Sequence, residues 1–253
     1  MVSINELKDL WQTVFGDERS FIDRWFETFY RPELSAVREA SGSLAARAFV
    51  IPLGTLNGSP CASLYAVASI PERRGTGLGI AVTSDAVQCA EKAGFSHILL
   101  HPADHGLFRF YKKLGFVPAF PISEAWIQLP HAAFTEALCE PAQYLEARDT
   151  LLSANRSVRP SLPLLSFFSS TGGRLYIGDG FCAAVENEGN KAVFKELITD
   201  GRSLSPDSLA SMASGAVSAL VREPASDSGG FPFAMRYGTA LSEECQWPGL
   251  MLD

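Results

Sequence analysis

Three glycines at alternate positions, Gly75, Gly77 and Gly79, follow a pair of arginines in the sequence Arg-Arg-Gly-Thr-Gly-Leu-Gly. Glycines spaced in this way let the backbone come close to a bulky group, because no side chain stands between them. A helix predicted over residues 80–93 begins directly afterwards, so its first N–H groups and the positive end of its dipole point at the loop. Such a helix start binds phosphate groups. The loop therefore predicts a site for a phosphate or pyrophosphate.

The glycine spacing excludes two common nucleotide loops. The dinucleotide fingerprint needs two residues between its second and third glycines, and this loop has one. The triphosphate-binding loop needs a Lys-Ser or Lys-Thr pair, which is not present here. Instead, Arg74-x-x-Gly77-x-Gly79 resembles the acyl-coenzyme A signature of the GNAT (GCN5-related) N-acetyltransferase superfamily.

A second motif strengthens this resemblance. Residues 108–116, Phe-Arg-Phe-Tyr-Lys-Lys-Leu-Gly-Phe, resemble the family's second conserved helix, in which a tyrosine precedes a short basic stretch and Gly-Phe. The tyrosine here is Tyr111. The two motifs occur in the family's order, with one predicted strand between them. The resemblance covers about residues 1–130.

The elements around the loop can be predicted from hydrophobic periodicity and turn residues. Residues 4–15 and 21–29 have helical spacing, and three extended apolar runs follow them. The expected order is helices 4–15 and 21–29, strands 34–40, 43–56 and 61–70, helix 80–93, strand 96–101 and helix 106–114. This order predicts an α+β fold. It is also the order of the GNAT fold, a mixed, mostly antiparallel sheet flanked by helices.

The resemblance implies that acetyl-CoA is bound and that coenzyme A is a product. A pantetheine arm would enter where strand 61–70 splays away from strand 96–101. Asp104 stands where many relatives carry an asparagine that contacts the arm, although a carboxylate cannot donate a hydrogen bond as an amide does. The implied cofactor residues are Val67, Ala68, Ser69, Arg74, Gly75, Thr76, Gly77, Leu78, Gly79, Ile80 and Asp104.

The chemistry implied is direct attack of a primary amine on the thioester, which needs no nucleophilic cysteine. Tyr111 matches the family position whose hydroxyl protonates the leaving thiolate. The alternative is that Tyr111 only packs beside the neighbouring phenylalanines. A backbone N–H in the segment from Val67 to Ser69 would stabilise the oxyanion.

The general base is left open. Many relatives carry a glutamate on the strand before the glycine loop, but this strand offers Ser63, Tyr65 and Ser69. The base could be Glu27, Glu124 or His101 acting through an ordered water, or the C-terminal carboxylate of Asp253. Candidate contacts to the acceptor are Glu27, Tyr30 and Tyr65. His97 and His101 lie on one face of a predicted strand, but no third ligand is in view, so we expect no metal site.

The second half of the chain repeats the order of strands, helix and strand. The expected elements are a helix over 134–152, a connector over 153–163, strands 164–169, 174–177, 181–186 and 192–197, a helix over 206–221 and a strand over 232–240. Its helix begins at Ser-Pro-Asp (205–207), which cannot cradle pyrophosphate. We therefore expect a tandem chain with an acetyl-CoA-binding domain (1–130), a helix and linker (131–163) and a degenerate GNAT-like domain (164–253). An unrelated accessory or dimerisation domain is the alternative for the second half.

The second half also offers acidic residues for contact with a cationic amine, or for solvation alone. They are Asp179, Glu186, Glu188 and Glu196.

Composition narrows the class of protein. The chain has 253 residues, a net charge of −7 and 47% hydrophobic residues. Acidity argues against nonspecific binding of nucleic acid. The five cysteines are scattered, which is typical of reduced thiols in a cytoplasmic protein, and no apolar run reaches membrane-spanning length.

These features predict an N-acyltransferase that moves an acetyl group to the primary amine of a small molecule or peptide. The alternative is a noncatalytic acyl-CoA sensor. The acceptor amine and the acyl chain length are left open, as is a homodimer.

Overall fold

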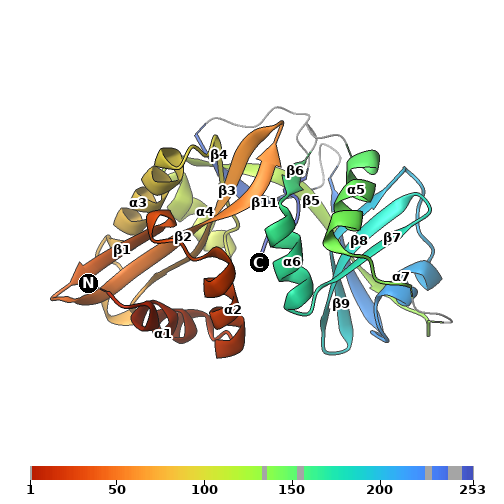
Figure 1. The fold of residues 1–253 in the computed structure, drawn as a ribbon, viewed down its shortest axis with the longest axis horizontal. Helices are drawn as coiled ribbons and strands as arrows, with labels where there is room; N and C mark the ends of the chain where they lie inside the picture. The colour runs from red at the N-terminus through yellow and green to blue at the C-terminus, as the bar shows by residue number, and fades with distance from the viewer. Residues whose placement is uncertain (1, 133–135, 153–156, 226–229, 239–246, 253) are drawn as a thin grey trace. The chain divides into compact units, whose positions relative to one another are not determined.

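The computed structural model describes residues 2–132, 136–152, 157–225, 230–238 and 247–252 (Figure 1). Contacts divide the chain into two compact units, each assembled from segments that are distant in the sequence. Unit 1 comprises residues 1–54, 59–118 and 235–240, and unit 2 comprises residues 55–58, 119–234 and 241–253. No helix in the described ranges has the length and apolar character needed to cross a membrane.

Unit 1 opens with the two predicted helices, α1 (Ile4–Phe15) and α2 (Arg19–Phe29). Helix α1 begins with a capping box, in which the Ser3 hydroxyl accepts from the Glu6 N–H and the Glu6 carboxylate accepts from the Ser3 N–H. It ends at Gly16, which adopts a left-handed conformation with φ +78°. The apolar faces of α1 and α2 are buried, as the helical spacing predicts.

The sheet of unit 1 has the order β1-β2-β3-β4-β11. Strands β1 and β2 pair antiparallel, β3 and β4 pair parallel, and β11 pairs antiparallel with β4 through Met235 and Arg236. The elements are η1 (Pro32–Leu34), β1 (Ser35–Ala40), β2 (Ser43–Leu56), β3 (Ser59–Ser69), η2 (Pro71–Arg73), α3 (Leu78–Lys92), β4 (His97–Leu100), α4 (His105–Lys112) and β11 (Phe231–Tyr237). The predicted mixed sheet flanked by helices is confirmed.

The side chains of strand β2 alternate between two packed layers, one on each face of the sheet of unit 1. Ala46, Ala48 and Val50 pack in the core that also contains the buried face of α3. Alternate residues point to the other face, where Phe49 contacts rings of α1 and α2. Figure 1 shows α1 and α2 in red and α3 in yellow around this sheet.

Unit 2 repeats this plan, with the strand order β5-β10-β9-β8-β7. Strands β9 and β10 are parallel and are joined through helix α7, as β3 and β4 are joined through α3. The elements are β5 (Phe116–Gln128), α5 (Pro141–Leu151), β6 (Val158–Pro160), α6 (Leu162–Ser170), β7 (Arg174–Gly178), β8 (Phe181–Glu188), β9 (Lys191–Thr199), α7 (Pro206–Met212) and β10 (Ser218–Pro224). The first residues of β5 belong to unit 1.

Two predictions in the second half are wrong. Residues 164–169, predicted as a strand, lie in helix α6, where Ser161 caps the first turn by accepting from the Leu164 N–H. The apolar residues of this segment fit either structure, and the cap decides between them. The helix predicted to residue 221 ends at Met212, because Ser214 and Gly215 adopt left-handed conformations and strand β10 follows.

Other boundaries also differ from the prediction. Helix α5 begins at Pro141 rather than near residue 134, since proline fits the first helical turn but not a helix interior. Residues 133–135, 153–156 and 239–240 of the predicted elements lie outside the described residues. Strand β5 was not predicted, because two prolines, Pro118 and Pro121, interrupt its sequence.

A buried ion pair joins α5 to β9 in unit 2. Arg148 donates to both carboxylate oxygens of Glu196, with an Nη2–Oε1 distance of 2.8 Å, and neither side chain is more than 1% exposed. The Tyr144 hydroxyl and the Trp247 indole donate to the same carboxylate, each at 2.7 Å. Glu196 is therefore occupied within the core, and the suggestion that it meets a cationic amine is wrong.

Replacing Glu196 with alanine is expected to lower the free energy of unfolding by about 3–5 kcal/mol, because Arg148 would remain buried without its partner. Chemical denaturation measures this loss. The matched control is Asp179→Ala, since the Asp179 side chain is 95% exposed and its removal should cost less than about 0.5 kcal/mol. Equal stability of the two variants would show that the buried pair contributes nothing.

Candidate active site

The glycine loop of unit 1 follows a short turn, η2, at the end of β3. The Thr76 hydroxyl donates to the Arg73 carbonyl over 2.7 Å and closes the loop. Gly75 and Gly77 have φ of +80° and +88°, conformations that glycine adopts without strain. A Cβ built on either residue would meet no atom within 4 Å. The space over the loop is therefore open, as a site for a bulky group requires.

Helix α3 begins at this loop with its N–H groups available. Gly77 is its N-cap, and no side chain of the described residues caps it. The first bond of the helix runs from the Ala81 N–H to the Gly77 carbonyl, so the N–H groups of Leu78, Gly79 and Ile80 have no partner within the helix. These groups and the helix dipole together favour an anion.

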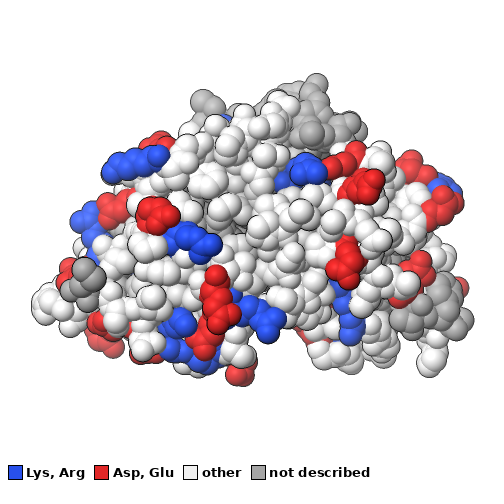
Figure 2. Space-filling model, in the orientation of Figure 1, with Lys and Arg blue, Asp and Glu red and all other residues white. Residues whose placement is uncertain are grey.

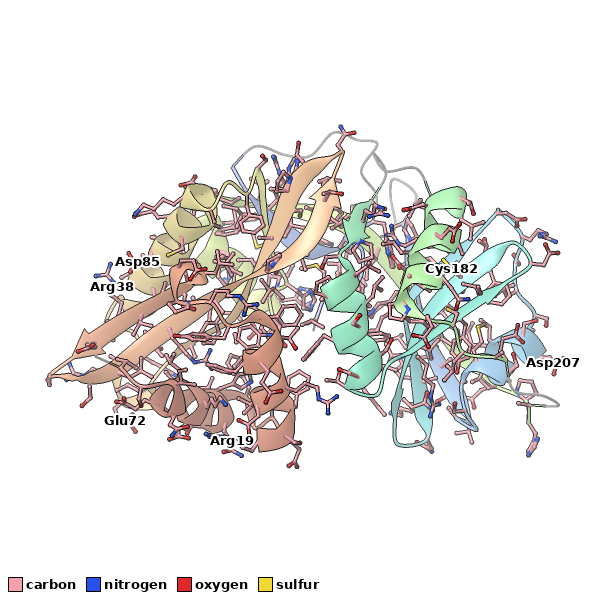
Figure 3. The ribbon with its side chains drawn as sticks, in the orientation of Figure 1. Arg19, Arg38, Glu72, Asp85, Cys182 and Asp207 are labelled. Carbon is pink, nitrogen blue, oxygen red and sulfur yellow. The ribbon has the colours of Figure 1, made fainter. Side chains whose placement is uncertain are left out.

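Two arginines flank the loop, and both are exposed. Arg73 donates to the Ser41 hydroxyl over 3.3 Å. Helix α3 is itself tied to strand β1, because Arg38 donates to Asp85 over 2.6 Å, and Figure 3 shows these two side chains together. On the face shown in Figure 2, basic and acidic side chains are interspersed rather than gathered by sign.

The start of α7 in unit 2 differs from this cradle. The Ser205 hydroxyl accepts from the Ser208 N–H over 3.1 Å, and Asp207 adds a negative charge to the first turn. Figure 3 labels Asp207 in this helix. A side chain of unit 2 therefore caps this helix start, unlike the start of α3.

Strands β3 and β4 separate as predicted. Their pairing ends at Ser63 and Leu99, although β3 continues to Ser69. Ala66 has φ +49°, which breaks the extended backbone before the segment 67–69. The predicted pantetheine contacts, Val67 to Ser69, therefore lie beyond the end of the pairing with β4. Val67 also packs against the same hydrophobic core as Tyr111.

Tyr111 is a buried member of that core, with 7% of its surface exposed. Its ring centroid lies 5.0 Å from that of Phe110 and 5.8 Å from that of Phe116. Leu78, at the start of α3, packs against the same core. The structure therefore brings Tyr111, the start of α3 and the end of β3 to one cluster.

Burial raises the pKa of the Tyr111 hydroxyl to about 12, and the negative charge of Asp104 adds to this shift. The hydroxyl is therefore protonated at neutral pH and can donate a proton. Asp104 itself caps α4, because its carboxylate accepts from the Leu107 N–H over 3.0 Å. That bond gives the carboxylate a structural role at the position predicted to contact the cofactor.

Of the three candidate acceptor contacts, one is exposed and two are tyrosines that stack on other rings. Glu27 is exposed on α2. Tyr30 stacks on Phe26 at a centroid distance of 5.0 Å, and Tyr65 stacks on Trp25 at 5.8 Å. Both tyrosines belong to one aromatic cluster, formed by Trp11, Trp25, Phe26, Tyr30, Phe49 and Tyr65.

The described base candidates lie on different elements, in both units. Glu124 lies in unit 2, where its carboxylate accepts from Arg222 over 2.9 Å. His97 lies 3.4 Å from Arg236, and His101 is half-buried. Asp253 lies outside the described residues. Among the described residues no group of three potential metal ligands is present.

Sequence analysis missed Arg47, which lies fully buried in the aromatic cluster. A signal was available, because Arg47 is the only charged residue in the 14-residue strand β2, Ser-Leu-Ala-Ala-Arg-Ala-Phe-Val-Ile-Pro-Leu-Gly-Thr-Leu. A lone charged residue in an otherwise apolar strand is unusual, because burying a charge is costly.

Comparison with known proteins adds to this geometry. Residues 4–116 match the model of the acetyltransferase (GNAT) family. No curated protein sequence matches the chain.

Solved structures share the fold over most of the chain. A probable N-acyltransferase from Enterococcus faecalis V583 aligns with TM-score 0.66 and 16% identity, over 92% of this chain and 69% of the other. A GCN5-related N-acetyltransferase from Sphaerobacter thermophilus aligns with TM-score 0.56 and 16% identity, over 95% and 94%. A tandem GNAT protein from the clavulanic acid biosynthesis pathway aligns with TM-score 0.54 and 14% identity, over 92% of each chain.

Proposed function

Since residues 4–116 form a domain of the GNAT acetyltransferase family, we propose that the protein transfers an acetyl group from acetyl-CoA to a primary amine. The observation that carries this proposal is the start of α3, which follows two left-handed glycines and is capped by no described side chain. Its first residue, Leu78, packs against the core that contains Tyr111. A helix start of this kind fits the pyrophosphate of coenzyme A.

The residues present fit acetyl-CoA in two places. The backbone of residues 75–80, with Arg74 beside it, would hold the pyrophosphate. The backbone of Val67, Ala68 and Ser69, beyond the end of the β3–β4 pairing, would hold the pantetheine arm. Acetyl-CoA supplies an activated thioester, and the leaving group is coenzyme A.

The chain's part in the reaction is to stabilise charge and to move one proton. As the amine nitrogen bonds to the thioester carbon, negative charge develops on the carbonyl oxygen, and a backbone N–H near Val67 would stabilise it. The carbon–sulfur bond then breaks, and the Tyr111 hydroxyl would give its proton to the sulfur. Water would accept the extra proton of the nitrogen and return a proton to the Tyr111 tyrosinate, which restores the acid.

The acceptor proposed is the amine of a small molecule or peptide, in the cytoplasm. Residues 1–130 would carry the acetyl-CoA site, followed by a helix and linker over 131–163. A degenerate GNAT-like domain over 164–253 would complete the chain. A homodimer is compatible with this division.

Replacing Tyr111 with phenylalanine is expected to lower kcat by about 10²-fold, because the general acid is lost, while acetyl-CoA binding is retained. Release of coenzyme A thiol measures kcat, and calorimetric titration measures binding. Tyr237→Phe is the matched control, because Tyr237 also packs on Phe116, at a centroid distance of 5.3 Å. Full activity in Tyr111→Phe would remove the proposed acid.

The rate should also depend on pH in a way that identifies Tyr111. A tyrosine ordinarily titrates near pH ~10, but the pKa of Tyr111 is raised to about 12, so its acidic form persists to higher pH. At pH values below about 11, deprotonation of Tyr111 should therefore cause no fall in kcat. A fall centred near pH ~10 would assign the acid to an exposed group instead.

A further inference from the structure

Arg47 carries a buried positive charge without a buried negative partner. The residue is 0% exposed, and its Cζ atom lies 4.9 Å from the centroid of Trp11 and 4.6 Å from that of Phe49. Within the described part of the chain, its hydrogen bonds go to two backbone carbonyls and none goes to a carboxylate. Desolvation lowers the pKa of the guanidinium to about 9, which still leaves it charged at neutral pH.

By donating to these two carbonyls, Arg47 connects α1 with β3. Arg47 Nε donates to the Leu7 carbonyl over 3.1 Å, and Nη1 donates to the Ala66 carbonyl over 2.7 Å. Nη2 is buried without an acceptor among the described residues. Ala66 is the residue of β3 with φ +49°, a conformation that costs alanine about 1 kcal/mol. Arg47 therefore holds the strained turn of β3 in place.

The Ala66 carbonyl and the Val67 N–H belong to the same peptide group. No described peptide bond is cis, so these two groups point in opposite directions. With its carbonyl directed at Arg47, the peptide directs the Val67 N–H away from the guanidinium. A hydrogen bond to a charged donor polarises the peptide and makes its N–H a stronger donor, an effect that is larger where water is excluded.

We propose that Arg47 is a positioning residue that orients and polarises the Ala66–Val67 peptide, so that the Val67 N–H stabilises the thioester oxyanion. This inference rests on the proposed acetyl transfer. When the amine adds to the carbonyl carbon, the carbonyl electron pair moves to oxygen and is met by the Val67 N–H. Arg47 neither gains nor loses a proton in this step. The absence of a neutralising carboxylate leaves its positive charge available to the peptide.

The cost of this arrangement also indicates a functional role. A buried charge without a partner destabilises the folded state, and an apolar residue of similar size would avoid that cost. Residues that lower stability while serving activity are common at active sites. We therefore expect a neutral residue at position 47 to lower turnover.

The test compares Arg47→Gln with Arg47→Lys, which keeps the positive charge. Infrared spectroscopy of bound acetyl-CoA, labelled with ¹³C at the carbonyl, reports how strongly that carbonyl is polarised. The band should lie at higher wavenumber in Arg47→Gln than in the wild type. In the same variant kcat should fall about 10- to 100-fold, with the Kd for acetyl-CoA changed by less than about threefold. Arg47→Lys should recover part of both effects.

An unchanged carbonyl band and an unchanged kcat in Arg47→Gln would overturn the role of Arg47 while leaving acetyl transfer intact. Failure of the wild type to bind acetyl-CoA would instead overturn the proposed function and this inference with it. If Arg47→Gln does not fold, Ala66→Gly is added, because glycine adopts the left-handed conformation without the arginine. A full rate in that double variant would also contradict the role of the charge.

Discussion

Replacing Met235 with aspartate is expected to unfold unit 1 and abolish acetyl-CoA binding. Met235 is 0% exposed and lies in the core that contains Tyr111. It pairs with Leu100 in β4, so β11 brings residues from a distant part of the sequence into the sheet of unit 1. A carboxylate there would lower the free energy of unfolding by at least about 4 kcal/mol, because it would be buried without a partner.

The neighbourhood of Met235 shows why this strand matters to the site. Two residues further on, Tyr237 packs on Phe116, and the Gly238 N–H donates to the Gly115 carbonyl over 3.1 Å. The end of β11 therefore supports the segment that follows Tyr111. Circular dichroism and denaturant unfolding measure the effect. Met235→Leu conserves volume and should cost less than about 1.5 kcal/mol. A folded, binding-competent Met235→Asp would show that β11 is dispensable.

Replacing Gly77 with glutamate is expected to weaken acetyl-CoA binding by more than about 100-fold, because a negative side chain would enter the proposed pyrophosphate site and oppose the anion. Gly77 is the N-cap of α3 and has φ +88°. Since a Cβ there would meet no atom of the protein within 4 Å, the loss of affinity should not come from a clash within the fold. Isothermal titration with acetyl-CoA measures the change.

Backbone strain must be separated from loss of the site. Gly94, just after α3, has φ +87° and also has open space around its Cβ position. Gly94→Ala and Gly77→Ala therefore impose similar strain of about 1–2 kcal/mol. Only Gly77→Ala should weaken binding. Equal affinities in these two variants would mean that the loop is not the pyrophosphate site.

The part of the fold predicted from the sequence is the part whose signals are local. The helical spacing of residues 4–15 and the glycines around Gly77 are signals that span a few residues, and α1 and the loop lie where these signals place them. The strand–loop–helix unit and the position of Tyr111 follow in the same way. Local signals are therefore enough to predict these elements.

Strand β5 and Arg47 were not predicted because contacts between distant parts of the sequence decide them. Strand β11 could be predicted as extended, but nothing in its sequence names β4 as its partner. Strand β5 is stabilised by a seven-residue pairing with β10, from Ile122–Pro224 to Gln128–Ser218, that outweighs its prolines. Arg47 was missed for a similar reason. Its partners, Leu7 and Ala66, are distant in the sequence and bind through backbone carbonyls that no side-chain pattern reveals.

The central claim is acetyl transfer from acetyl-CoA to an amine at unit 1. Its most direct test is thiol release from acetyl-CoA across a panel of primary amines, with product mass measured for each and Gly77→Glu as the inactive reference. We expect amine-dependent thiol release and an acetylated amine with the wild type, and neither with the variant. Tight acetyl-CoA binding without release on any amine would contradict catalysis and favour an acyl-CoA sensor. The absence of binding would contradict both.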